Sequence, residues 1–162
     1  MKRFLFLAAI FAAALFTSCE KEGVPHTGDL TGNLYGVWTL TNKTEVVKSN
    51  DGDKTSNVDY TNVHFYLAFG EFPFPHAIAK KGSFTQLDLD DVDVDAVTFT
   101  YNADQRKISF KKKLWLSDEF FKYNMTLDGT FDVLELSDTL FVIQQENILL
   151  KTTTTYTFQR SK

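Results

Sequence analysis

Residues 121–136 read Phe-Lys-Tyr-Asn-Met-Thr-Leu-Asp-Gly-Thr-Phe-Asp-Val-Leu-Glu-Leu, two alternating runs of apolar and polar residues around Asp128-Gly129. Alternation with a period of two is typical of a half-buried β-strand, whereas a helix repeats its apolar residues every three or four positions. Asp-Gly favours a type I′ turn, because both central residues of that turn need positive φ angles. This stretch therefore predicts an antiparallel hairpin with strands at 120–127 and 130–136.

The same alternation recurs from residue 35 to the end of the chain. It is clear at 63–69, 97–101 and 155–158, and polar segments such as 49–53 and 102–104 separate the runs. Strands are expected at 35–47, 58–69, 82–89, 94–101, 105–112, 120–127, 130–136, 139–145 and 151–159. Strands in such close succession leave no room for a sizeable helix, so the chain is predicted to be all-β.

Eight or nine consecutive antiparallel strands with short links favour an up-and-down β-barrel, since a closed barrel has no exposed strand edges. A two-sheet β-sandwich shows much the same alternation and is the alternative. The interior of an eight-stranded barrel is either filled by side chains or wide enough for one small ligand. The side chains that would line a cavity for an apolar ligand, or fill a solid core, are Phe65, Leu67, Phe99, Phe110, Tyr123, Met125, Phe131 and Tyr156.

The N-terminus is interpreted as an export signal. Lys2 and Arg3 precede an apolar run at 4–16, and Thr17-Ser18-Cys19 follows it. Such a run makes a helix of about 20 Å, too short for a bilayer core of about 30 Å. The segment resembles a bacterial lipoprotein signal peptide at 1–18, in which Cys19 becomes the lipidated first residue. The alternative is an ordinary secretory signal with an incidental cysteine.

The expected domains follow from this reading. Residues 20–33 are polar, contain glycines and lack periodicity, so we expect a lipidated Cys19 and a flexible tether at 19–33. One β-barrel domain is expected at 34–162.

Cys19 is the single cysteine of the chain, and the domain would therefore have no disulfide, no thiolate nucleophile and no cysteine-bound zinc. The net charge of −4 argues against a nucleic-acid partner.

Catalytic and metal motifs are not found in the sequence. It has neither Gly-x-Ser-x-Gly nor His-Glu-x-x-His, and no phosphate-binding glycine loop. The acidic cluster at 88–95 lacks the order of an EF-hand and is interpreted as a solvated hairpin. The chain is predicted not to be an enzyme and to need no cofactor or metal.

The loop at 71–76, Glu-Phe-Pro-Phe-Pro-His, is a candidate for a partner contact. Its two prolines oppose regular strand pairing and favour extended conformations at Phe72 and Phe74. Aromatic side chains on a stiff loop are suited to binding another protein. The alternative is that both rings cap the open end of the barrel as part of the core.

Two motifs at the ends of the predicted domain carry a family resemblance. Gly36-x-Trp38 in the first strand, and Tyr156-x-Phe158-x-Arg160 in the last, resemble the lipocalin superfamily. With the lipoprotein signal and the polar tether, the chain is similar to short lipocalin-like lipoproteins of Gram-negative bacteria. The resemblance implies that Trp38 plugs the closed end of the barrel and that Arg160 stacks over it, a cation–π pair. The Thr-Asp-Tyr motif of lipocalins is missing.

The N-terminal sequence also predicts a cellular location, and the location suggests the partners. Glu20 follows Cys19 in place of the aspartate often linked to retention in the inner membrane, so the resemblance favours an outer-membrane lipoprotein, with exposure at the cell surface left open. The expected partners are the membrane, through acyl chains on Cys19, and a small apolar ligand in the barrel. The alternative partner is a protein of a cell-envelope complex, with the chain as an accessory module.

Overall fold

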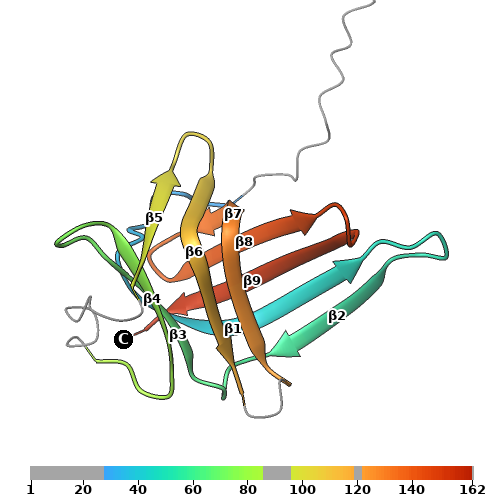
Figure 1. Cartoon of the computed structure of the whole chain (residues 1–162), viewed down its shortest axis with the longest axis horizontal. Helices are drawn as coiled ribbons and strands as arrows, with labels where there is room; N and C mark the ends of the chain where they lie inside the picture. The colour runs from blue at the N-terminus through green and yellow to red at the C-terminus, as the bar shows by residue number, and fades with distance from the viewer. Residues whose placement is uncertain (1–27, 86–95, 119–121, 162) are drawn as a thin grey trace, which may run out of the picture.

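The computed structural model describes residues 28–85, 96–118 and 122–161 (Figure 1). These residues form nine strands and no helix. The strands are β1 (Gly36–Val47), β2 (Lys54–Asp59), β3 (Phe65–Gly70), β4 (His76–Lys81), β5 (Val97–Asn102), β6 (Lys107–Ser117), β7 (Asn124–Leu136), β8 (Leu140–Asn147) and β9 (Thr152–Arg160). In the described part of the chain there is accordingly no helix that could cross a bilayer.

The strands form one antiparallel sheet that closes on itself. Neighbours follow chain order from β3 to β9, and β9 returns to pair with β1 from Trp38–Arg160 to Val47–Thr152. The other edge of β1 is shared, because β3 pairs with its residues 36–39 and β2 with its residues 42–47. The result is an eight-stranded barrel with β2 as an additional strand. The predicted up-and-down barrel is confirmed, and the sandwich is not formed.

The hairpin predicted at Asp128-Gly129 is wrong. Both residues lie inside the single long strand β7, although Gly129 does have a positive φ of 75°. The register against β6 shifts there, since Phe110 pairs with Gly129 but Leu114 pairs with Leu127. Three residues of β6 thus oppose one residue of β7 in a β-bulge, which bends a strand sharply without ending it. The positive φ of the glycine serves a bend, not a turn.

Two other predicted boundaries are corrected. The strand expected at 58–69 is two strands, β2 and β3, separated by a turn in which the amide of Val63 donates to the carbonyl of Tyr60 at 2.8 Å. The strand expected at 82–89 lies earlier, as β4 at 76–81; residues 82–85 are not in a strand and 86–89 lie outside the described residues. The paired prolines before His76 obscured β4 in the sequence.

Inward-facing side chains of the eight barrel strands make one apolar core, against which the partly buried Val58 of β2 packs. Phe69 lies near its centre, with its ring centroid 4.9 Å from that of Phe99 and 5.8 Å from that of Phe141. The largest side chains with essentially no exposure are Trp38, Tyr60, Phe65, Phe69, Phe131, Phe141 and Phe158. Burial of about 150–250 Å² by each aromatic ring is the main stabilising contribution in a domain without disulfides.

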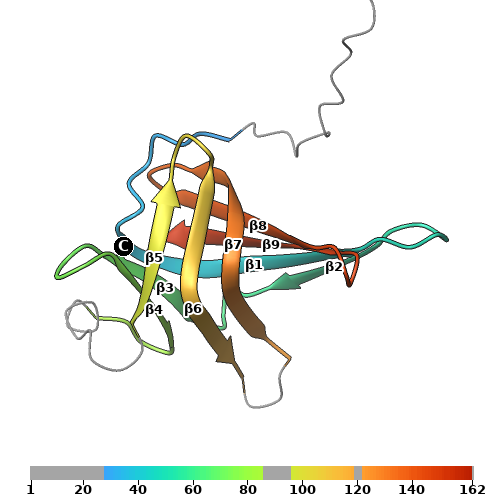
Figure 2. The same cartoon turned by 45° about the horizontal axis from the view of Figure 1, so that its top comes forward.

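The first half of β7 leaves β8 and crosses the face of the long sheet β8-β9-β1-β2 (Figures 1 and 2). Its pairing with β8 begins at Asp132–Gln144, so the earlier residues have backbone groups directed away from β6 that need other partners. Side chains supply them. The Tyr60 hydroxyl bonds both the amide and the carbonyl of Asn124, and the Tyr156 hydroxyl bonds both groups of Thr126.

The amide side chain of Gln145 continues this row, donating to the carbonyls of Asp128 and Thr130 at 2.8 and 3.1 Å. Lys43 adds a bond from its ammonium to the side-chain oxygen of Asn124 at 2.7 Å. The side chains of Tyr60, Tyr156 and Gln145 thus bond the backbone of β7 at every second residue from 124 to 130, where a neighbouring strand would otherwise pair. They join the first half of β7 to the opposite wall of the barrel.

Residues 28–33, predicted as part of the flexible tether, lie against the barrel. The amide of Gly32 donates to the carbonyl of Leu136 at 2.8 Å, and the amide of Leu136 donates to the carbonyl of Asp29 at 2.6 Å. Arg106 also donates to the carbonyl of Gly28 at 2.8 Å. The stretch between Cys19 and the barrel is therefore shorter than predicted, with residues 20–27 outside the described part of the chain.

Candidate functional site

The closed end of the barrel is built around Trp38. Its indole is fully buried, packs 5.5 Å from the ring of Phe141 and donates from Nε1 to the carbonyl of Leu34 at 2.8 Å. Arg160, its partner in the β1–β9 register, places Cζ 4.1 Å from the indole centroid. This is the geometry of a cation–π contact.

The guanidinium of Arg160 also fastens the segments around it. Nε donates to the carbonyl of Asp138 at 2.7 Å, Nη1 to that of Tyr35 at 3.0 Å, and Nη2 to that of Asn33. A methyl group on Gly36 would lie 2.8 Å from Nη1, and the φ of Gly36 is +123°. Only glycine suits that position, which gives the Gly36-x-Trp38 motif a structural explanation.

The side chains predicted to line a cavity are almost all buried in contact with one another. Phe110 packs 6.0 Å from Phe131, and Phe131 packs 6.4 Å from Tyr156, measured between ring centroids. The buried members of the predicted set are Phe65, Leu67, Phe99, Phe110, Met125, Phe131 and Tyr156. Tyr123 differs, because it is partly exposed and borders a pocket at the surface.

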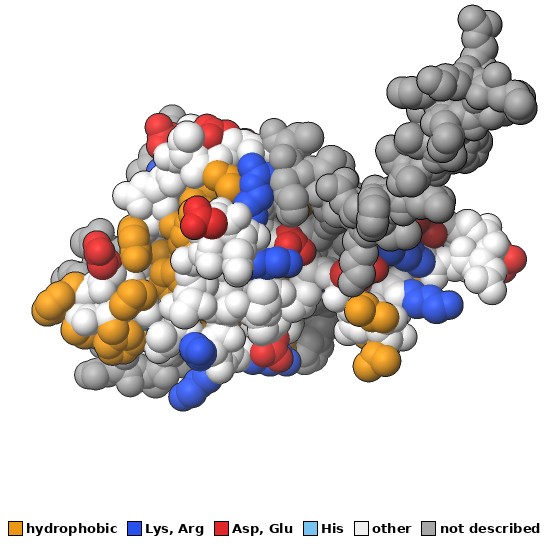
Figure 3. All heavy atoms as spheres, turned by 90° about the horizontal axis from the view of Figure 1, so that it is seen from above, with side chains coloured by type: hydrophobic (Ala, Val, Ile, Leu, Met, Phe, Trp, Pro, Cys, Tyr) orange, Lys and Arg blue, Asp and Glu red, His pale blue; other side chains and the backbone are white. Residues whose placement is uncertain are grey.

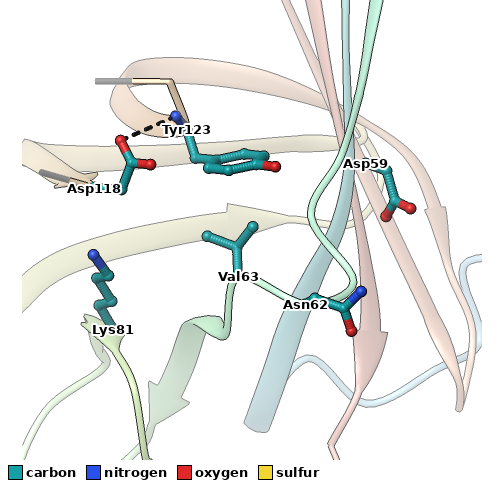
Figure 4. Close-up of a pocket in the computed structure, with 6 residues that line it drawn as sticks. All are labelled: Asp59, Asn62, Val63, Lys81, Asp118 and Tyr123. Atoms are coloured by element: carbon teal, nitrogen blue, oxygen red, sulfur yellow. Dashed lines mark hydrogen bonds between the residues drawn. The ribbon is translucent and has the colours of Figure 1, made fainter. Parts of the chain in front are cut away.

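That pocket, of about 400 Å³ (Figure 4), lies where β4 and β6 end and β7 begins, whereas Trp38 lies near the start of β1. Figure 4 shows the ring of Tyr123 above Val63, with Lys81 and Asp118 on one side of them and Asp59 and Asn62 on the other. The carboxylate of Asp118 accepts from the amide of Tyr123 at 3.3 Å. Most of the lining is polar or charged, unlike the apolar cavity expected for a lipid-like ligand.

The pocket is lined by charged side chains of both signs, Asp59, Asp118 and Lys81. The hydroxyl and amide of Thr61 donate to Asp59 and lower the pKa of its carboxyl below the usual range, so it is ionised at neutral pH. Burial raises the pKa of the neighbouring Tyr60 phenol, whose ring packs edge-on 5.3 Å from Tyr123. The side chains that line the pocket thus offer carboxylates, an ammonium group, an amide and the phenol of Tyr123, a set suited to hydrogen bonding a small polar molecule.

A second pocket, of about 380 Å³, borders β4, the start of β5 and the bulged part of β6. It is lined by Ala79, Val97 and Leu114, by Lys112 and Lys113 of the β-bulge, and by Ala96, Trp115 and Leu116. The side chain of Trp115 is half exposed there. It is open at the side of the barrel, and the core residues Val97 and Leu114 form part of its wall.

The loop between β3 and β4 presents the two phenylalanines of interest. Phe72 is 87% exposed, and the peptide bond from Phe72 to Pro73 is cis. Phe74 is less exposed and packs edge-on 5.7 Å from the ring of His76. His76 is completely buried, with Nδ1 2.8 Å from the carbonyl oxygen of Phe74. The interpretation of Phe72 as part of the core is wrong, while Phe74 rests partly on the barrel.

Among the residues that the structure describes, no group of histidines, cysteines and carboxylates could hold a metal ion. The acidic cluster at 88–95 lies outside the described residues, as do the predicted signal at 1–18 and Cys19.

One exposed apolar segment was not predicted from the sequence. Ile148, Leu149 and Leu150 form the turn between β8 and β9 and are 81%, 94% and 69% exposed. Three consecutive apolar residues between two predicted strands, where polar turn residues are the rule, were the available signal. Tyr60 was also missed, because nothing in its local sequence shows that its hydroxyl bonds β7.

Comparisons with known proteins found no match to this chain. No protein-family model matches it, and neither a curated protein nor a solved structure is significantly similar. The class of the protein is therefore defined by its architecture, a closed antiparallel up-and-down barrel with a buried tryptophan and a covering arginine at one end.

Proposed function

We propose that this chain is a lipid-anchored, non-enzymatic binding module of the bacterial cell envelope, related to the lipocalin-like lipoproteins. The single observation that carries the proposal is the contrast between a core whose aromatic rings pack on one another and a loop that exposes Phe72 almost completely. A buried core leaves the surface as the place for recognition. An exposed aromatic side chain on a fixed loop is a common anchor of protein interfaces.

The envelope location is supported by the N-terminal sequence. An apolar run at 4–16 follows Lys2 and Arg3, and Cys19 comes three residues after it. A cysteine directly after such a signal is the position of lipidation in lipoproteins. Two or more acyl chains hold a protein firmly at a membrane, whereas one binds marginally. The outer membrane is the proposed location, on the presence of Glu20 after Cys19. The lipocalin relationship is supported by the Trp38–Arg160 contact and by the barrel topology.

Binding of a small ligand is the second candidate. The apolar ligand expected in the barrel would have to displace side chains that now contact one another, such as Phe110 and Phe131. The pocket beside Tyr123 favours a different ligand, small and polar, held by Lys81, Asp59 and Asn62. It would sit at the mouth of the barrel and not in its core.

Cross-linking in the producing bacterium tests the proposal. A photoreactive phenylalanine analogue in place of Phe72 is expected to yield a discrete adduct of defined mass with an envelope protein. The matched control carries the analogue in place of Asn50, an exposed residue of the β1–β2 turn. If position 72 gives no adduct, or the same products as position 50, the loop is not a binding surface.

Mass spectrometry of small molecules extracted from purified residues 20–162 tests the second candidate. This segment contains every described strand. A stoichiometric apolar molecule would make the barrel a carrier and reverse the order of the two candidates, whereas an empty, stable protein supports recognition at the surface.

A further inference from the structure

We propose that the β8–β9 turn, Ile148-Leu149-Leu150, inserts into the lipid surface to which the chain is anchored. The insertion would orient the barrel on the membrane. The biological setting of this inference rests on the proposed envelope location, but the insertion itself can be tested without it. Residues 148–150 are called the apolar tip.

The apolar tip is a well-defined turn whose side chains point outward. The amide of Leu150 donates to the side chain of Asn147 at 3.1 Å, and the amide of Lys151 donates to the carbonyl of Ile148 at 3.3 Å. Lys151 takes a positive φ of 52°, and its carbonyl accepts from the amide of Lys48 on the adjoining hairpin at 2.8 Å. The backbone is thus fixed while the apolar side chains remain in solvent, an arrangement with an evident cost unless something covers them.

The position of the tip suits a flat partner. In Figures 1 and 2 the β8–β9 and β1–β2 hairpins project away from the body of the barrel. Figure 3 shows a small hydrophobic group toward that end, with Lys or Arg side chains beside it, and a larger hydrophobic group toward the end where β3 and β4 lie. A protein partner would need a groove to receive a projecting turn, whereas a bilayer accepts it without one.

The surrounding charges are those of an interfacial segment that is held by apolar contact. Lys151 directly follows the tip, and Lys54 lies opposite the half-exposed Val47 at its base. Lys48 is paired with Glu146 at 2.9 Å, and Asp51 and Asp53 on the neighbouring turn offset the remaining lysines. Because the positive and negative charges nearly cancel, burial of the apolar side chains has to supply the attraction, and added salt should change it little.

The proposed lipid anchor can reach the same surface. Gly28 lies against Leu134 and Glu135, and Glu135 pairs with Val142 of β8, seven residues before Leu149. Those seven residues cover about 24 Å of strand, while the nine steps from Cys19 to Gly28 extend to about 30 Å. The tether is therefore long enough for the acyl chains and the apolar tip to enter one bilayer.

Insertion at the tip would leave the Phe72 loop free. The β3–β4 loop follows Gly70, beside the first residues of β1, and the apolar tip adjoins Val47, the last residue of β1. These two places are separated by the length of β1, 12 residues or about 37 Å. A tip of three aliphatic side chains binds no more tightly than one short acyl chain, so it orients a protein that lipidation has already anchored.

Vesicle binding by residues 20–162, which contain no cysteine, tests the inference. The vesicles consist of phosphatidylethanolamine and phosphatidylglycerol and are present in large excess, because the tip without acyl chains binds only marginally. Leu149→Cys carries an environment-sensitive fluorophore. On addition of vesicles the label is expected to brighten and to be quenched by quenchers placed on the lipid acyl chains. The matched control, Asn50→Cys on the neighbouring turn, should show neither effect. Equal responses at both positions, or no response at 149, would overturn the inference.

A second variant series uses no label. Leu149→Asp is expected to lower vesicle partitioning about tenfold or more, since it replaces a leucine-sized apolar group by a charge, and Phe72→Asp is expected to leave it unchanged. Partitioning that depends steeply on salt, or that falls equally in both variants, would mean simple charge or non-specific adsorption. If the apolar tip does not insert, the proposed function is still tested separately, by cross-linking at position 72 and by lipidation at Cys19.

Discussion

The hydroxyl of Tyr156 donates to the carbonyl of Thr126 at 3.1 Å and accepts from the amide of the same residue at 3.2 Å. One side chain from β9 thereby satisfies both backbone groups of a residue on β7, as a neighbouring strand would do. Tyr60 repeats the arrangement at Asn124. The barrel is therefore held together at this place by side chains, and their removal should have measurable consequences.

Tyr156→Phe is expected to destabilise the protein by about 1–3 kcal/mol, because it leaves the amide and carbonyl of Thr126 without their partner. Chemical denaturation measures the effect. Tyr101→Phe is the matched control. The Tyr101 hydroxyl is buried without a hydrogen-bond partner among the described residues, so its removal should be neutral or stabilising by up to about 1 kcal/mol. Equal losses in both variants would refute the strand-like role of Tyr156.

Stability should fall at alkaline pH. Burial raises the pKa of Tyr156 to about 12, so the native state keeps the phenol neutral, while the unfolded chain ionises it near the ordinary tyrosine pKa of 10. The contribution is fully present below pH 10 and is lost as the pH rises toward 12, by about 2–3 kcal/mol in total. Burial also raises the pKa of Tyr60 and Tyr101, which act in the same direction.

Denaturation midpoints measured between neutral pH and pH 11 test this prediction. Tyr156→Phe should show a shallower decline above pH 10 than the wild type. An identical decline in the two proteins would assign the alkaline sensitivity to other groups.

Trp38→Ala is expected to cost about 3–5 kcal/mol, as truncations of large buried aromatic residues do. Arg160→Lys should cost less, about 1–2 kcal/mol, because lysine keeps the charge but cannot reproduce the fork that binds the carbonyls of Asp138, Tyr35 and Asn33. Thermal or chemical denaturation measures both. A near-zero effect of Trp38→Ala would show that the closed end does not depend on the indole.

Cys19→Ala is expected to abolish incorporation of a labelled fatty acid into the protein in the producing bacterium, since the thiol is the proposed site of acylation. Ser18→Ala, one residue earlier, should retain the label. Labelling that survives Cys19→Ala, or an unlabelled wild type, would contradict the lipid anchor and leave an ordinary secretory signal.

Much of the architecture is predictable because burial on one face of a strand leaves a period of two in the sequence. That period indicated the antiparallel barrel, and nearly all of the side chains that it assigned to the interior are buried, such as Phe99 and Phe131. The Gly36-x-Trp38 motif can also be recognised in the sequence. A glycine is required at position 36 because its φ is positive and a nitrogen of Arg160 lies close to it.

Register and long-range contacts could not be predicted in the same way. Asp128-Gly129 has the composition of a turn, yet pairing with β6 on both sides of it holds the chain in one strand. The bonds from Tyr60, Tyr156 and Gln145 to β7 join residues distant in the sequence, and no local pattern announces them.

The sequence by itself determined the strand periodicity, the apolar composition of the core and the basic and apolar pattern at 1–18 that is interpreted as an export signal, because each is expressed in neighbouring residues. Only the tertiary structure decided that the rings meet one another in the core, that the Tyr123 pocket is polar, and that Phe72 and the apolar tip stand at opposite ends of β1. These depend on which strands lie side by side, and closure of the sheet fixes that relationship through contacts between distant parts of the chain.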